Sequence, residues 1–345
     1  MFGFRSDKSK ANAQNELPAN AEKNRLAAVS VGFLGKLPSH ADFLSQNLAS
    51  REAQELDDCL KQWVTDLDQK ESQSNQDRRL NSVGFALVGG HGRQTIVGAI
   101  YDSTDRLGRR YPFSYFVRLT LTDLYFRPAL AWFAAEQVLS NKSIEVADSS
   151  LSQSQRLLDL SQLPVALPNS EQLDWLKDLE KIDTTPSVKQ LKSASMESMV
   201  TTSFTSWIES ILGNDIRCKT TALAMLHAKV DRYINQGANG ELTLPLGPAS
   251  SAKLSLLFWF QLLSLLLAGK EWRPDFIWSM HETNSHLYIL DRPLTPSRLN
   301  KAFLGEQCTD TPVFNHCVDQ NWAEKMLSNN ALLLLDAVIA WGHGK

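Results

Sequence analysis

The first strongly patterned stretch of the chain is VGFLGKLPSHADFLSQNL, residues 31–48. It opens on an apolar run that ends at Gly35, which is typical of a strand that bends or lies close to another backbone segment. Pro38 closes the run, because proline lacks the amide hydrogen that a continuing central strand would donate. Ser39 is a candidate helix N-cap, and apolar residues follow at helical spacing from Phe43 onward. The pattern therefore predicts a strand that turns sharply into a helix or a helical turn.

The next elements are predicted from changes in the hydrophobic period. Residues 53–67 carry apolar side chains at spacings of three and four, which predicts an amphipathic helix. In SVGFALVGGHGRQTIVGAIY, residues 82–101, two apolar runs flank the glycine-rich segment 89–92, which predicts two strands joined by a tight turn. A polar connection then leads into a further predicted strand, residues 113–119.

The middle of the chain is less regular. Residues 128–139 form a predicted helix with proline in its first turn, and residues 140–203 form a variable, Ser/Gln-rich helical insertion or connection. Two more helices are predicted at 204–212 and 221–234. Glycine and proline interrupt the pattern over residues 237–245, so no regular element is expected there.

The most apolar stretch is SAKLSLLFWFQLLSLLLAGK, which contains residues 254–268. It includes Ser255, Gln261 and Ser264, and it is short of the roughly 20 apolar residues that a membrane span needs. We interpret it as a buried central helix capped by Gly269, with a membrane segment as the alternative.

The C-terminal part is predicted to contain two strands, 276–280 and 286–290, followed by a helix at 295–304 and a helical apolar repeat at 331–341. These patterns suggest three regions. They are a disordered polar tail (1–28), one large domain (29–305) that includes the variable insertion, and a helical C-terminal extension (306–345).

Composition narrows the class of protein. A hydrophobic content of 43% is that of a globular chain, and a net charge of −3 argues against a nucleic acid partner, although a local basic patch is compatible with it. The four cysteines contain no C-x-x-C pair, which favours reduced thiols over a zinc knuckle or a disulfide framework. No apolar segment follows the basic residues of the N-terminal tail, so we expect a cytoplasmic protein.

Catalytic and ligand-binding motifs are incomplete. Ser39, His40 and Asp42 lie together, but no G-x-S-x-G occurs and triad members normally come from distant positions. Neither of the usual phosphate-binding glycine motifs is present. A nucleotide or small ligand would have to bind unconventionally, at the 89–93 hairpin (Gly89 to Arg93) and the arginines of the 106–110 segment.

Metal binding is also not expected. His281 and His286 have the wrong spacing for H-E-x-x-H and lie on a predicted hairpin. Cys308, His316 and Cys317 lack a fourth ligand at a fitting distance along the chain. The sequence therefore predicts no metal, no cofactor and no catalytic residue.

The second motif is the string DRLGRRYPF, residues 105–113. Arginine pairs well with carboxylates, so Asp102 or Asp105 is expected to fix Arg106 or Arg109 and to hold this connection rigid.

These two motifs carry a family resemblance. GFLGKLPSHADF resembles the opening signature of the TagF/ImpM family, G-[FYW]-x-G-K-[LM]-P-x-x-G-D-F, with Ala41 where the family usually has glycine. The string from Asp105 resembles the second signature, D-x-x-G-R-x-[FY]-P-[FL], and the turn Arg292-Pro293-Leu294 is similar to the end of the family domain. The resemblance spans residues 31–304, interrupted by the variable middle.

The resemblance implies an α/β (α+β) fold, with a mostly antiparallel sheet flanked by helices and related to longin-like modules. It also implies a non-enzymatic accessory regulator of a type VI secretion system that represses secretion after translation. Family members are associated with the forkhead-associated scaffold protein and with its threonine phosphorylation pathway. We therefore expect partners among the secretion components, recruitment to the inner-membrane apparatus, and no direct membrane insertion.

The candidate residues have two interpretations, an interaction surface or the architecture of the turns. They are Gly35, Lys36, Pro38, His40, Asp42, Phe43, Asp105, Arg106, Gly108, Arg109, Arg110 and Pro112. The alternative function is a nucleotide- or ligand-binding switch or a hydrolase that uses the 89–93 hairpin with Arg106 and Arg109.

Overall fold

The computed structural model describes residues 30–38, 40–74, 82–88, 95–119, 194–212, 216–235, 241–267, 270, 274–279, 285–290, 294–305 and 318–342. The polar tail 1–28, the glycine-rich turn, the predicted helix 128–139 and most of the 140–203 insertion lie outside these residues. The three predicted regions and their boundaries stay predictions.

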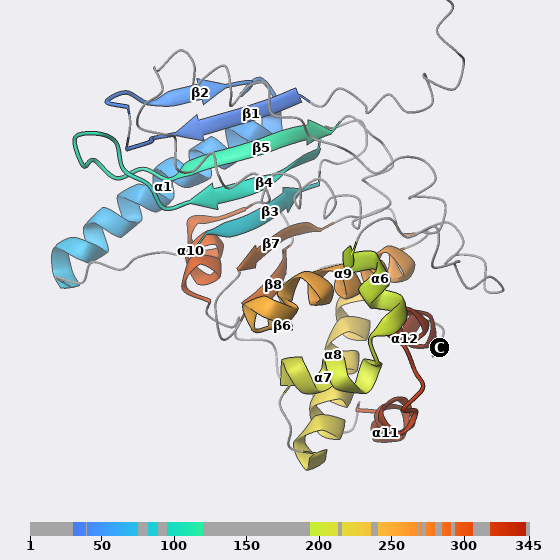
Figure 1. Ribbon diagram of the computed structural model, residues 1–345. Coiled ribbons are helices and arrows are strands. Elements are labelled where there is room, and N and C mark those ends of the chain that lie inside the picture. Colours follow the sequence, from blue (N-terminus) through green and yellow to red (C-terminus); the bar gives the residue numbers. More distant parts are fainter. Residues whose placement is uncertain are drawn as a thin grey trace, which may run out of the picture.

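The centre of the fold is an eight-stranded sheet in the order β2-β1-β5-β4-β3-β7-β8-β6, and all neighbouring strands are antiparallel (Figure 1). The strands are β1 (Ser30–Gly35), β2 (Leu44–Gln46), β3 (Val83–Leu87), β4 (Thr95–Tyr101), β5 (Phe113–Leu119), β6 (Glu241–Gly247), β7 (Asp275–Ser279) and β8 (Ser285–Leu290). The predicted α+β fold with an antiparallel sheet is confirmed.

Helices cover both faces of this sheet. They are α1 (Arg51–Ser74), α6 (Ala194–Thr201), α7 (Phe204–Leu212), α8 (Ile216–Asn235), α9 (Ala249–Leu266), α10 (Pro296–Leu304), α11 (Gln320–Ser328) and α12 (Leu334–Gly342). Successive strand residues point to opposite faces. On β3, Phe85 therefore packs in the cluster formed with α1 and α10, whereas Ala86 packs in the cluster formed with α9 and its neighbouring helices.

The expected central helix is α9, and its side chains from Leu256 to Leu263 are buried. This helix is long and apolar enough to cross a membrane, but the buried core helix of a folded domain meets the same two criteria. Two of its buried side chains, Ser255 and Trp259, make hydrogen bonds in the core. The indole of Trp207 donates to Ser255 Oγ at 2.9 Å, and that of Trp259 donates to the Pro245 carbonyl at 2.8 Å. The predicted cap, Gly269, lies outside the described residues.

The predicted helix after Ser39 is wrong, because this segment forms the edge strand β2. Leu44 is buried and Ser45 is exposed, which is the period of a strand, and Gly35 pairs with Leu44 across the two strands. The helix starts only at Arg51, after Ser50, whose hydroxyl accepts the Ala53 amide at 3.2 Å.

Strand β6 was not predicted, because Pro245 lies inside it. It occupies the edge of the sheet, where one side of the strand has no neighbouring strand, and proline is tolerated at such edges. The pairing with β8 shifts register between Pro245 and Gly247. At the end of the predicted insertion, residues 194–201 form the helix α6, and Met199 is buried.

The C-terminal helices belong to the same hydrophobic cluster as α9. Trp341 of α12 packs edge-on against Trp259, with ring centroids 5.7 Å apart. Trp322 of α11 stacks on His227 of α8 at 4.0 Å. Residues 320–342 are therefore held against α8 and α9 by aromatic packing.

Candidate interaction site

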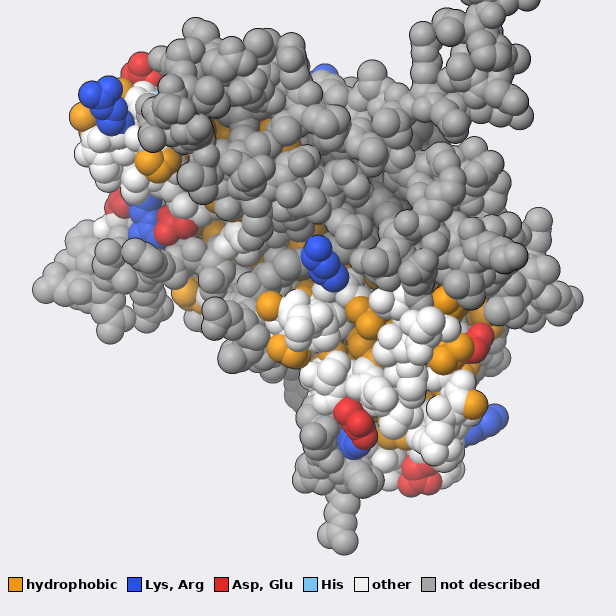
Figure 2. Space-filling model, viewed as in Figure 1, with side chains coloured by type: hydrophobic (Ala, Val, Ile, Leu, Met, Phe, Trp, Pro, Cys, Tyr) orange, Lys and Arg blue, Asp and Glu red, His pale blue; other side chains and the backbone are white. Residues whose placement is uncertain are grey.

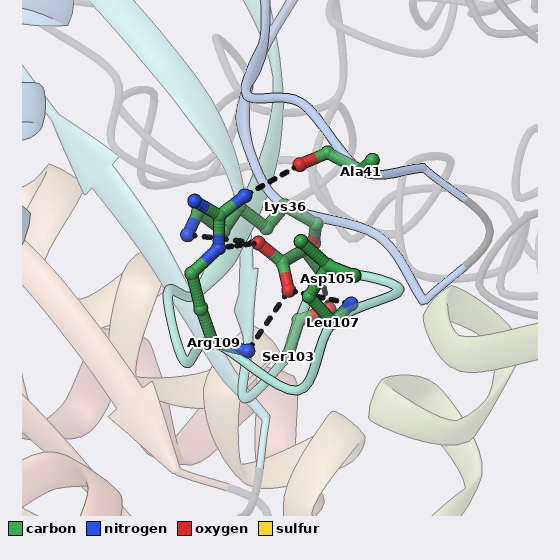
Figure 3. A network of polar contacts seen from close by, with 6 residues as sticks. All are labelled: Lys36, Ala41, Ser103, Asp105, Leu107 and Arg109. Carbon is green, nitrogen blue, oxygen red and sulfur yellow. Dashed lines mark hydrogen bonds and ion pairs between the residues drawn. The ribbon is translucent and has the colours of Figure 1, made fainter.

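Two loops meet at one end of the sheet. The first loop, residues 36–43, connects β1 to β2, and the second loop, residues 102–112, connects β4 to β5. Because β1 and β5 are antiparallel neighbours, with Leu34 opposite Ser114, the end of β1 lies beside the start of β5. The sheet thus brings together two segments that are far apart in the sequence (Figures 1 and 3).

Asp105 organises the second loop. Its carboxylate is fully buried and accepts the backbone amides of Leu107 and Arg109 on Oδ1, at 2.9 and 2.8 Å. On Oδ2 it accepts the Arg109 guanidinium at 2.7 Å and pairs with Lys36 of the first loop at 3.1 Å (Figure 3). One carboxylate therefore closes its own turn and binds a cation from each loop.

This environment favours the ionised form of Asp105. Removal from water alone would raise the pKa of the carboxyl group. The hydrogen bonds from the Arg109 amide, the Lys36 ammonium, the Arg109 guanidinium and the Leu107 amide outweigh that effect and hold the pKa well below its usual range. The charge at Asp105 is thus present at every pH near neutral.

Further bonds join the two loops directly. Arg109 Nη2 donates to the Ala41 carbonyl at 2.8 Å, and the Arg106 amide donates to the His40 carbonyl at 2.8 Å. The Ser103 hydroxyl donates to the Lys36 carbonyl at 2.7 Å. All three bonds run from the second loop to backbone carbonyls of the first. The loops therefore form a single unit, which we call the two-loop platform (residues 36–43 and 102–112, with residue 39 outside the described residues).

The glycines of the motifs have architectural roles. Gly35 has φ of +124°, and a Cβ at this position would lie 2.1 Å from the Pro112 carbonyl oxygen. Gly108 has φ of +80°, with open space around the Cβ position. Glycine is therefore required at Gly35 by both conformation and space, and at Gly108 by conformation alone.

The base of the platform is held by a second set of polar contacts. Arg110 makes a bidentate pair with Asp102, in which Nε and Nη2 each lie 3.0 Å from a carboxylate oxygen. The Tyr111 hydroxyl donates to Asp57 of α1 at 3.1 Å. Burial, and then the nearby Asp57 charge, raise the pKa of Tyr111, so this hydroxyl remains a donor.

The predicted pairing of acids with arginines is confirmed in part. Asp105 does fix Arg109, but Asp102 binds Arg110 rather than Arg106 or Arg109. The Arg106 side chain is exposed and makes no hydrogen bond or ion pair within the described part of the chain. The motif therefore contains two arginines that pair with carboxylates, Arg109 and Arg110, and one that is directed to solvent, Arg106.

The remaining predicted residues divide between surface and interior. Pro38 and Asp42 are exposed, whereas His40 and Pro112 are buried. His40 and Asp42 thus differ in environment, and Ser39 and the 89–93 hairpin lie outside the described residues. Within the described ranges, no three His, Cys, Asp or Glu side chains are grouped to hold a metal ion.

Sequence reasoning missed two members of the platform, Leu107 and Ala41. Leu107 is 69% exposed at the tip of the second loop, and Phe43 is 40% exposed at the end of the first. The signal for Leu107 was an isolated apolar residue within a charged string. At this end of the sheet, hydrophobic and cationic side chains lie side by side on the surface (Figure 2).

Comparison with known proteins gives a family match and similar solved structures. The model of the TagF N-terminal domain, described as type VI secretion system-associated, matches residues 32–161, a range that includes both loops. The crystal structure of PA0076 from Pseudomonas aeruginosa PAO1 is 28% identical, over 41% of this chain and 64% of that chain, with a TM-score of 0.33. The chain thus spans less than two thirds of that protein. No curated protein matches the present chain.

Proposed function

We propose that this chain is a type VI secretion system-associated protein that represses secretion after translation, and the match of the TagF N-terminal domain to residues 32–161 supports this proposal. In this proposal it acts without catalysis, by binding a core or scaffold component such as the forkhead-associated protein. A repressor that occupies its target competes by mass action and needs no reactive residue. We place it in the cytoplasm, recruited to the inner-membrane apparatus through its partner.

The observation that carries the proposal is that both family motifs contribute to one rigid surface. Asp105 is buried and binds groups from both loops, while Arg106, Leu107 and Arg109 remain exposed around it. Because the backbone that carries these side chains is already ordered, binding costs little further backbone entropy. This arrangement therefore favours recognition of a macromolecular partner.

The alternative of a nucleotide- or ligand-binding switch receives less support from the same residues. The Arg109 guanidinium is bound to Asp105 and to the Ala41 carbonyl, so it is not available as a phosphate clamp without breaking the platform. The doubly substituted variant Arg93→Ala, Arg106→Ala tests the switch. If a folded variant still represses secretion, a switch that depends on these arginines is refuted. Loss of repression by the folded single variant Arg93→Ala would favour the switch, because residue 93 is not part of the two-loop platform.

The repressor proposal is tested by secretion of the tube protein from cells that lack, carry or overproduce the chain. We expect overproduction to reduce secreted tube protein while its cytoplasmic amount stays constant, and we expect a secretion component to co-purify. The matched control is the Glu324→Ala variant, since Glu324 lies exposed on α11, away from the platform. Unchanged secretion in all three strains would refute the proposal.

A further inference from the structure

Phe43 and Leu107 are the large hydrophobic side chains that remain exposed in the described part of the chain, and both lie on the two-loop platform. A single exposed leucine is ordinary on a protein surface. Here, however, the two exposed side chains come from separate segments that direct hydrogen bonds join. Phe43 also packs edge-on against Tyr111, with ring centroids 5.1 Å apart, so its ring has a defined orientation.

Leu107 is held equally firmly although it is exposed. Its amide donates to Asp105 Oδ1 at 2.9 Å, and the following Gly108 amide donates to the Asp105 carbonyl at 2.9 Å. The leucine therefore lies at the tip of a tight turn closed from inside by a buried charge. An apolar side chain presented in this way suits insertion into a pocket, because its backbone is already fixed before binding.

The charges around these side chains favour an acidic partner. Lys36, Arg106 and Arg109 supply three positive charges on the platform, against two carboxylates, Asp42 and Asp105, and Arg110 is neutralised by Asp102. The Asp105 carboxylate is buried, while the side chain of Arg109 is 58% exposed. The platform thus presents an excess of positive charge to solvent on a chain whose net charge is −3.

We propose that the two-loop platform binds a protein partner through an apolar pocket rimmed by carboxylates, with Leu107 and Phe43 entering the pocket and Arg106 pairing with the rim. Aromatic and arginine side chains dominate the energy of such interfaces, and rim charges steer the encounter. The identity of the partner as a secretion component rests on the proposed function, whereas the chemistry of the surface does not.

Site-specific photo-crosslinking in cells that contain the secretion system tests this proposal. The photoreactive residue p-benzoylphenylalanine replaces Leu107 or Phe43, and the controls replace Thr221 on α8 or Glu324 on α11, both exposed at the other end of the molecule (Figure 1). We expect adducts at positions 43 and 107 only, with one protein, and linked peptides whose neighbouring residues include several Asp or Glu. In the variant that carries the crosslinker at position 107, the added substitution Arg106→Glu should reduce the yield of the adduct about tenfold, because like charges would then face each other.

Four results would overturn the proposal. They are adducts no stronger than at positions 221 and 324, adducts with a second copy of this chain or with lipid, linked peptides without acidic residues, and an adduct that Arg106→Glu leaves unchanged. Thermal unfolding of each variant verifies that its fold is retained. Secretion measured in the same strains separates the two proposals. If the chain represses secretion but forms no adducts, binding through the platform is refuted and the repressor function stands. If the crosslinked partner is acidic but unrelated to secretion, the repressor function is refuted and the chemistry of the surface stands.

Discussion

Replacing Gly35 by alanine should destabilise the protein through the junction of the two loops. Gly35 ends β1 with φ of +124°, and an added Cβ would lie 2.1 Å from the Pro112 oxygen and 2.7 Å from Phe113 Cα. Both atoms belong to the backbone at the start of β5. They cannot rotate out of the way, so relief of the clash requires β1 and β5 to separate where the platform is attached.

The size of the effect follows from two contributions. A left-handed backbone conformation costs an alanine about 1–2 kcal/mol, and φ of +124° at Gly35 lies beyond the αL region, so the conformational cost there is at least as large. Forcing extra volume against fixed neighbours adds about 1–3 kcal/mol, so the free energy of unfolding should fall by about 2–5 kcal/mol. Gly108→Ala is the matched control. It also places alanine at positive φ, +80°, but no atom lies within 4 Å of the new Cβ, so only the conformational cost of about 1–2 kcal/mol applies.

The assay is denaturant unfolding followed by tryptophan fluorescence and by circular dichroism, with coincidence of the two transitions as the check of two-state behaviour. We expect the loss in Gly35→Ala to be about twice that in Gly108→Ala, or larger. Equal losses in the two variants would refute the steric argument and with it the tight junction of the loops.

Three further predictions concern the platform base and the core. Asp105→Asn should lower the thermal midpoint at pH 7, and the difference from wild type should narrow as the pH falls below about 4. The reason is that a carboxyl group whose pKa is lowered in the folded state stabilises the fold above its unfolded pKa and loses this effect in acid. A difference in thermal midpoint that stays constant with pH would contradict this prediction. Cys59 is buried and desolvation raises its pKa to about 12, so peptide mapping should find it unalkylated by iodoacetamide at about pH 8 in the native protein and alkylated after unfolding. Trp341→Ala should reduce the free energy of unfolding by about 3–5 kcal/mol, because it removes a buried ring between α8, α9 and α11; a loss typical of an exposed site, under about 0.5 kcal/mol, would show that α12 does not pack into the core.

Elements with a long, regular period were predictable from the sequence. The helix predicted at 53–67 has a period that runs over several turns, and the two apolar runs within residues 82–101 are bounded by the glycine-rich segment. The structure has α1 (Arg51–Ser74), β3 (Val83–Leu87) and β4 (Thr95–Tyr101) at these places. The segment after Ser39 was ambiguous, because a few apolar residues fit both periods. Its pairing with β1 decided the outcome. Strand β6 could not be predicted around Pro245 without knowing that it would be the edge strand.

The candidate site divides in the same way. The pair Asp105 and Arg109 lies four residues apart, so it was accessible from local spacing. The bond from Arg109 to the Ala41 carbonyl spans 68 positions and ends on a backbone oxygen, for which side-chain identity gives no signal. The exposure of Leu107 likewise depends on the turn that Asp105 closes. Sequence motifs thus located the loops, and the sheet determined which of their residues meet.

The measurement that tests the account most directly is secretion of the tube protein from cells that overproduce wild type, Leu107→Asp or Glu324→Ala, at matched protein levels. Leu107→Asp places a charge at an exposed tip without touching the core, so the variant should fold. The account predicts that wild type and Glu324→Ala silence secretion while Leu107→Asp leaves it active. Equal silencing by all three would contradict the role of the two-loop platform in repression.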